Sequence, residues 1–291
     1  MNRRRLRTLA SCALWAVAGG CGQPGHADVH PATPPQHIVA GSLLAAEVLL
    51  AIAPRERIAG VHELAANPRF SLVVDEVAGL PLVGAEPEQL LAVQPDLVIV
   101  DAFTRPETLA LLDGAGVPVL RTATPANFDD IAANIERIGR ACHLDGSAAA
   151  LVSTMRGRLA ELAAGNDASL RGFRVMSLDG ALHTMGKGSL FDAVVTAAGA
   201  TNQAAANGIG PFCRLDIEWV LAFSPDVLVI DSMPGSEDVD RAWIAQTSGL
   251  EYVPAVRDGR VLFVPSPQFA TTSHRLVDAA FLLRERLRRW R

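Results

Sequence analysis

One unit of sequence occurs twice in this chain, and it limits the folds that the chain can adopt. Each copy has the pattern of a short helix, a Pro-Asp turn and an apolar strand that ends at an aspartate: EPEQLLAVQPDLVIVD at 86–101 and DIEWVLAFSPDVLVIDS at 216–232. Glu88 and Glu218 both lie eight positions before the aspartate of the turn. A repeated helix, turn and buried strand predict two similar α/β lobes rather than one continuous sheet. Two lobes imply a cleft, and a cleft implies a ligand.

The first 21 residues have the pattern of an export signal. Four arginines lie between positions 3 and 7, residues 9–17 form an apolar run, and small residues precede Cys21. This order of basic, apolar and small segments predicts a signal peptide. We expect 1–21 to be a bacterial lipoprotein signal with Cys21 as the lipidated residue; an ordinary secretory peptide cut after Ala18 is the alternative.

The segment 22–36 is rich in Pro, Gly and His and has no periodic pattern, which predicts a flexible tether. No other run is long and apolar enough to span a bilayer. We therefore expect a monomer in the periplasm or cell envelope, held to a membrane by its lipid alone. Loss of the signal removes four arginines from a chain of formal net charge −5, and this acidity argues against nucleic acid as a partner.

The body of the chain alternates between predicted strands and helices, which is typical of a parallel α/β layout. We expect an N-terminal lobe at 37–127 and a C-terminal lobe at 166–291. Between them, at 128–165, apolar residues recur at helical spacing, which predicts a long connecting helix that is broken near Asp145-Gly146. Cys142 and Cys213 are the thiols of this body; they either pair across the lobes or stay separate and buried.

The paired Glu-x-(Leu/Val)-Leu-Ala-x-x-Pro-Asp units are accompanied by an opening strand that leads to Ser42 and Glu47, and by the run TMGKGS at 184–189 before a helix. Together these features resemble class III solute-binding proteins, which serve ATP-driven importers of cobalamin, haem and ferric siderophores. The resemblance runs from His37 to the C-terminus. It implies an α/β fold of two Rossmann-like lobes with central parallel sheets, joined by one long connecting α-helix. It also implies a receptor that captures a metal chelate in the cleft and delivers it to an ABC transporter permease.

Glu88 and Glu218 each follow a predicted helix start, where a carboxylate gains about 0.3 to 1 kcal/mol from exposed backbone N–H groups. This local role alone would explain either residue. In the family that the chain resembles, the matching glutamates, one on each lobe, form salt bridges with arginines of the permease. We therefore expect both residues to dock the permease, so that their loss weakens docking without changing ligand affinity.

Loops that follow the carboxyl ends of parallel strands are where such sheets bind ligands. This rule selects the candidate ligand-binding residues Ser42, His62, Phe103, His183, Phe212, Arg214 and Phe269. Phe212 stands where the resemblance to cobalamin binders places an aromatic that packs on the ligand; a core phenylalanine is the alternative. Leu82 replaces another aromatic of those binders, which weakens the case for cobalamin.

Histidines are candidate ligands for haem iron or a bare metal ion, because imidazole is a favoured donor to both. His183 is the first choice because it precedes the glycine-rich loop, although an isolated histidine is more often solvated or hydrogen-bonded. We assign no metal ligand and expect no cofactor. Three arginines are candidates to clamp an anionic siderophore: Arg105, Arg214 and Arg275.

Enzyme motifs are incomplete in this sequence. Gly186-Lys187 lacks the glycine spacing of a phosphate loop, and there is no Gly-x-Ser-x-Gly, His-Glu-x-x-His or Cys-x-x-Cys motif. We therefore expect a binding protein and not an enzyme. Two alternatives stay open: a receptor for bare zinc or manganese that uses His62, Glu63, His183 and Asp231, and a lipoprotein of the same fold that takes no part in transport.

Overall fold

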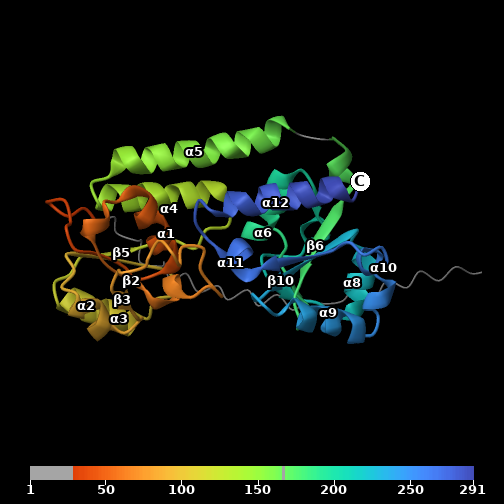
Figure 1. Cartoon of the computed structure of the whole chain (residues 1–291), viewed down its shortest axis with the longest axis horizontal. Coiled ribbons are helices and arrows are strands. Elements are labelled where there is room, and N and C mark those ends of the chain that lie inside the picture. Colours follow the sequence, from red (N-terminus) through yellow and green to blue (C-terminus); the bar gives the residue numbers. More distant parts are fainter. Residues whose placement is uncertain (1–28, 166–167) are drawn as a thin grey trace, which may run out of the picture.

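The computed structural model describes residues 29–165 and 168–291, and these form two parallel sheets with helices packed around them (Figure 1). The N-terminal sheet has the strand order β3-β2-β1-β4-β5 and the C-terminal sheet the order β11-β10-β6-β8. The first comprises β1 (Ile38–Ala40), β2 (Ile58–His62), β3 (Leu82–Val83), β4 (Leu97–Val100) and β5 (Val119–Arg121). The second comprises β6 (Arg174–Leu178), β8 (Thr201–Asn202), β10 (Val227–Ser232) and β11 (Val261–Pro265). A short antiparallel pair, β7 (His183–Thr184) with β9 (Cys213–Arg214), lies beside the second sheet.

The apolar strands of the two repeated units become central strands. All four residues of β4 are buried, as are the first four of β10. Each strand pairs in parallel on both sides, β4 with β1 and β5, and β10 with β6 and β11. A run of apolar residues without polar alternation is what a parallel strand covered on both faces requires.

The aspartate of each Pro-Asp turn holds the neighbouring strand. Asp96 accepts hydrogen bonds from the backbone N–H groups of Gln36 (2.6 Å) and His37 (2.9 Å), just before β1. Asp226 accepts from the backbone N–H of Arg174 at the start of β6 (3.0 Å) and from its guanidinium (2.7 and 2.9 Å). The hydrogen bonds from Arg174 lower the pKa of Asp226. The repeated aspartate thus has the same structural role in both lobes.

The helices of the N-terminal half differ in how they begin. They are α1 (Leu43–Ile52), α2 (Pro87–Ala92), α3 (Pro106–Gly114), α4 (Phe128–Ala141) and α5 (Asp145–Ala164). The side chains of Ser42 and Asn127 accept the N–H groups of Ala45 and Asp130 at the starts of α1 and α4, which satisfies backbone donors that a helix leaves free.

The segment 128–165 consists of two helices rather than one. The break lies at residues 142–144, slightly before the expected Asp145-Gly146, and His143 adopts φ 54° there. The 20-residue α5 runs beside α4 and extends from the first lobe to the second (Figure 1). The two helices pack closely at Gly139, where a Cβ atom would lie 2.3 Å from that of Ala148.

The C-terminal half contains α6 (Leu190–Ala198), α7 (Gln203–Ala206), α8 (Ile217–Phe223), α9 (Glu237–Gln246), α10 (Pro254–Arg257), α11 (Ser266–Ala270) and α12 (Leu276–Arg289). Helix α12 packs on α5 and α6 and lies in the same layer as α4 (Figure 1). Buried apolar side chains of both lobes form one connected cluster through these helices. A shared, closely packed helical layer resists bending, and we therefore expect only modest opening of the cleft.

Both cysteines of the body are free thiols: Cys142 is buried after α4, and Cys213 is partly exposed on β9. Burial raises the pKa of the Cys142 thiol to about 12, so this thiol is unreactive at neutral pH. In the ranges 29–165 and 168–291, no helix has the combination of length and apolar character that crossing a bilayer requires.

Candidate functional site

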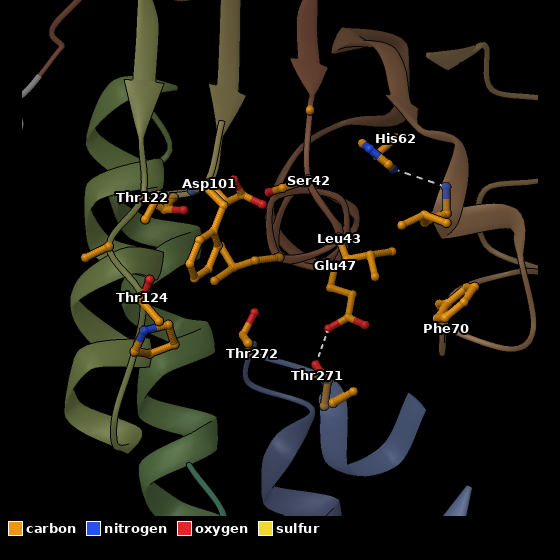
Figure 2. A pocket seen from close by; sticks show the side chains of 18 residues that line it. Ser42, Leu43, Glu47, His62, Phe70, Asp101, Thr122, Thr124, Thr271 and Thr272 are labelled. Atoms are coloured by element: carbon orange, nitrogen blue, oxygen red, sulfur yellow. Dashed lines mark hydrogen bonds between the residues drawn. The ribbon is translucent and has the colours of Figure 1, made fainter. Parts of the chain in front are cut away.

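A cavity of about 250 Å³ lies where the carboxyl ends of the N-terminal strands meet the C-terminal lobe (Figure 2). Asp101 and Thr122 line it directly after β4 and β5, and Ser42 lines it two residues after the end of β1. Thr271 and Thr272, which follow β11 and α11, close it from the other lobe. The strand-end rule therefore locates the cavity, as expected for parallel sheets.

Glu47 on α1 forms part of the cavity wall and joins the two lobes. Its side chain is almost completely buried, and its Oε2 atom accepts a hydrogen bond from Thr271 Oγ1 at 2.6 Å and a second one from Ser273 Oγ. Burial raises the pKa of this carboxyl, and the two hydroxyl hydrogen bonds only partly offset that effect. Glu47 appeared in the sequence motif, but its contact with the second lobe was not predicted.

His62 ends β2 and lines the same cavity. Its Nδ1 atom accepts the backbone N–H of Leu64 at 3.2 Å, so the neutral ring carries its proton on Nε2. Burial lowers the pKa of the imidazole, which keeps the ring neutral at physiological pH. In this state His62 offers an N–H donor and no free lone pair for a metal ion.

Two phenylalanines give the cavity an apolar side. Phe103 is 80% exposed and Phe70 is 41% exposed, and both line the cavity. Asp101 fixes the turn that carries Phe103, because its Oδ1 atom accepts the N–H of Phe103 (2.9 Å) and the hydroxyl of Thr104 (3.1 Å). An aromatic side chain held in solvent at a cavity mouth is available for a ligand.

A second group of predicted residues lies together on the C-terminal lobe. The β7–β9 pair places His183 opposite Arg214. The His183 ring stacks on Phe212 with centroids 4.8 Å apart, and Phe212 is 66% exposed. His183 Nδ1 lies 3.0 Å from Asp179 Oδ2, so its Nε2 atom is the one left for a ligand. Arg214 Nε donates to the carbonyl of Ala181 at 3.2 Å.

The remaining predicted ligand residue, Phe269, is placed differently. It packs against Phe191 at a centroid distance of 5.9 Å and against the apolar core. Its neighbours, residues 270–272, line the cavity in its place. The strand-end rule selected Phe269 after β11, but this residue lies within α11, and Thr271 and Thr272 after that helix line the cavity instead.

Two of the arginines that could clamp a siderophore already have carboxylate partners. Arg105 pairs with Glu86 at 2.6 Å, and Arg275 pairs with both oxygens of Glu76 at 2.7 and 2.8 Å. The second of these ion pairs crosses between the lobes. An anionic ligand would have to compete with these partners, which makes both residues poor anion clamps.

Glu88 and Glu218 are exposed in the first turns of α2 and α8. Pro87 occupies the first turn of α2 as expected, and Asp216 stands at the N-cap of α8 but makes no capping hydrogen bond with its side chain. Each helix leads back into the strand that follows it, β4 or β10. The N-terminus of each helix therefore lies at the carboxyl edge of its sheet, which in the N-terminal lobe is the cavity edge.

The structure does not assemble the bare-metal site. Across the described ranges, no three His, Cys, Asp or Glu side chains come close enough to hold a metal ion. His62 and Glu63 thus do not join His183 and Asp231 in one cluster. Cys21 lies outside the described residues.

Residues 38–267 match the family model described as periplasmic binding protein. A cobalamin-binding protein of Halobacterium salinarum is 26% identical over 247 residues, covering 84% of this chain and 67% of that protein. The uncharacterised ABC transporter substrate-binding lipoprotein YvrC of Bacillus subtilis is 23% identical over 247 residues, covering 82% of this chain and 76% of that protein. The apo structure of the periplasmic heme-binding protein RhuT from Roseiflexus sp. RS-1 has a TM-score of 0.73 and 26% identity, covering 87% of this chain and 97% of that one.

Proposed function

Since this chain belongs to the periplasmic binding protein family, we propose that it is the cargo receptor of an ABC importer, which binds a metal chelate between its two lobes and delivers it to a membrane permease. Cobalamin, haem and ferric siderophores are the chelates concerned. The family carries substrates in transport and is not a family of enzymes, and we propose that this chain likewise makes and breaks no bond. The family belongs to the periplasm or cell envelope.

The exposed aromatic pair Phe103 and Phe212 carries the proposal. Phe103 and Phe212 are 80% and 66% exposed, and each lies near other predicted ligand residues. Phe103 lines the cavity of the N-terminal lobe, and Phe212 directly precedes β9 in the C-terminal lobe. A flat macrocycle offers two apolar faces to such side chains. Because Arg105 and Arg275 are already paired with carboxylates, the aromatic side chains favour haem or a corrinoid over an anionic siderophore.

His183 is the histidine best placed to reach the metal of such a chelate. Its contact with Asp179 orients the ring and increases the basicity of Nε2, and the stack on Phe212 limits its rotation. His62, by contrast, uses Nδ1 for the backbone. We therefore assign axial coordination to His183 as part of this proposal.

Glu88 and Glu218 supply the permease contacts in this proposal. Their exposure on the carboxyl edges of the two sheets is what a pair of docking charges needs, because rim charges steer and orient association. We further propose that a lipid on Cys21 holds a monomer at the membrane. The description of the YvrC relative as a lipoprotein supports the anchor.

The proposal is tested by visible absorption titration and native mass spectrometry of the purified protein with cyanocobalamin, haemin, a ferric siderophore and zinc. We expect one of the three chelates to bind with one-to-one stoichiometry. Binding of zinc alone would replace the proposal with a receptor for bare metal ions. If the purified protein binds a chelate but the Glu88 and Glu218 variants leave uptake by cells unchanged, the protein is instead a lipoprotein that takes no part in transport.

A further inference from the structure

The polar lining of the Glu47 cavity, defined by the residues around Glu47 in Figure 2, is rich in hydrogen-bond acceptors. Glu47 and Asp101 contribute carboxylates, and no lysine or arginine is part of the lining in the described chain. A ligand group that enters this space therefore meets acidic side chains and no cationic one, and the negative charge on Glu47 grows as the pH rises through its raised pKa. Coulomb repulsion in a partly buried site is only weakly screened by water.

Two hydroxyl groups of this lining already donate hydrogen bonds within the protein. The hydroxyl of Thr271 donates to Glu47, and that of Thr122 donates to the carbonyl of Val100 at 3.1 Å. Those two hydroxyl groups retain only acceptor lone pairs for a ligand. The Nε2–H of His62 remains a donor at the edge of the cavity, and the hydroxyls of Ser42, Thr124 and Thr272 line the cavity as further groups that can donate or accept.

One carboxylate oxygen of Glu47 accepts no hydrogen bond from the second lobe. Both hydroxyls from the second lobe donate to Oε2, and Figure 2 shows the other oxygen directed away from Thr271, toward the side where Phe70 lies. A charge-assisted hydrogen bond from a ligand to this second oxygen would be stronger than a neutral one. A ligand that brings an N–H or O–H group to this oxygen gains that difference.

On the basis of the proposed function, we propose that the Glu47 cavity is a subsite for a hydrogen-bond-donating arm of the chelate, such as an amide, a hydroxyl or an ammonium group, and that it rejects carboxylate arms. Glu47 is then the residue that determines specificity for the periphery of the chelate, while the aromatic side chains bind its faces. The same macrocycle should bind differently when only its arms change.

Matched probe pairs test this inference. Haemin is compared with haemin diamide, in which both carboxylate arms are amides, and cyanocobalamin is compared with a derivative in which one side-chain amide is hydrolysed to a carboxylate. In each pair that binds, we expect the amide form to have a dissociation constant at least about tenfold lower than the carboxylate form, which corresponds to about 1.4 kcal/mol.

The variant Glu47→Gln should reduce or invert this preference. The glutamine carbonyl can still accept from Thr271 and Ser273, which turns the amide N–H group toward the cavity. We expect carboxylate arms to gain about tenfold in affinity relative to amide arms. Glu63→Gln is the matched control, because it removes an equal charge from an exposed position next to His62 that does not line the cavity, and it should leave the ratio unchanged.

The outcomes separate the inference from the proposed function. The inference is wrong if the macrocycles bind equally well with amide and carboxylate arms. It is also wrong if Glu47→Gln does not change the ratio of the two dissociation constants. Either result leaves the receptor function intact. Absence of binding by all four probes overturns the inference, and the receptor function is overturned as well only if the ferric siderophore also fails to bind. If Glu47→Gln fails to fold, as judged from its melting temperature, Asp101→Asn takes its place in the same titrations, and an unchanged ratio there also overturns the inference.

Discussion

Glu47 of the N-terminal lobe and Thr271 of the C-terminal lobe form a buried hydrogen bond of 2.6 Å across the cleft. The two residues are separated by 224 positions in the sequence. Ser273 adds a second hydroxyl to the same carboxylate oxygen, and Arg275 pairs with Glu76 nearby. The segment after α11 is thus tied to the first lobe at the bottom of the proposed ligand site.

The variant Thr271→Val removes one of these hydroxyls with little change in volume. It leaves a buried carboxylate with one donor fewer, and we expect the free energy of unfolding to fall by about 1 to 3 kcal/mol. Chemical denaturation measures the difference. Thr154→Val is the control, because the Thr154 hydroxyl donates to Ala150 on the exposed side of α5 and should contribute little. Equal stability of the two variants would show that the inter-lobe contact is unimportant.

The raised pKa of Glu47 predicts how stability depends on pH. A carboxyl whose pKa is higher in the folded protein than in the unfolded chain binds its proton more tightly when folded. Glu47 therefore stabilises the folded protein fully below its ordinary pKa of 4.5. This contribution is lost as the pH rises through the raised pKa of Glu47 in the folded protein. We expect the free energy of unfolding of the wild type to fall relative to that of Glu47→Gln as the pH rises through this range. A difference that is constant from pH 4 to 8 would contradict the prediction.

The proposed coordination by His183 has a spectroscopic signature. If haemin is the cargo, His183→Ala should shift the Soret band of the complex, because the iron loses an axial nitrogen ligand. His37→Ala removes an exposed histidine at the start of β1 and serves as the control. Identical spectra for the wild type and His183→Ala would assign the iron ligand elsewhere.

Charge reversal tests the proposed docking residues. We expect Glu88→Lys and Glu218→Lys to weaken binding to detergent-solubilised permease by about tenfold or more when combined, because each replaces attraction by repulsion at the rim. The dissociation constant for the chelate should not change. Asp145→Lys is the matched control, since Asp145 is also exposed in the first turn of a helix, and α5 lies along the opposite edge of the molecule from α2 and α8 in Figure 1. Normal docking by the double variant would exclude this surface.

The sequence predicted the fold through short-range patterns. The apolar runs before Asp101 and at 227–230 could only be buried central strands, and the structure confirms both. Family membership and the two-lobed α/β fold are likewise confirmed. The break between α4 and α5 was placed slightly too late, because Gly146 drew attention away from His143, whose positive φ ends the first helix.

The cavity was only partly predictable. Ser42, His62 and Phe103 follow strand ends, and the rule for parallel sheets found them. Thr122 also follows a strand end and could have been found by the same rule. Glu47 and Thr271 could not, because their contact depends on how the segment after α11 returns to α1, and no local pattern encodes a hydrogen bond between residues so far apart. Phe269 was selected by the same rule, but it lies within α11 and packs against Phe191 and the apolar core.

Amide hydrogen exchange with and without bound chelate tests the central claim most directly. A chelate held between the lobes should slow exchange both in residues 101–104 and 122–125 of the N-terminal lobe and in residues 212–214 and 270–273 of the C-terminal lobe. Slower exchange in both lobes on binding is the predicted result. Protection confined to one lobe, or located away from the carboxyl ends of the strands, would contradict binding between the lobes.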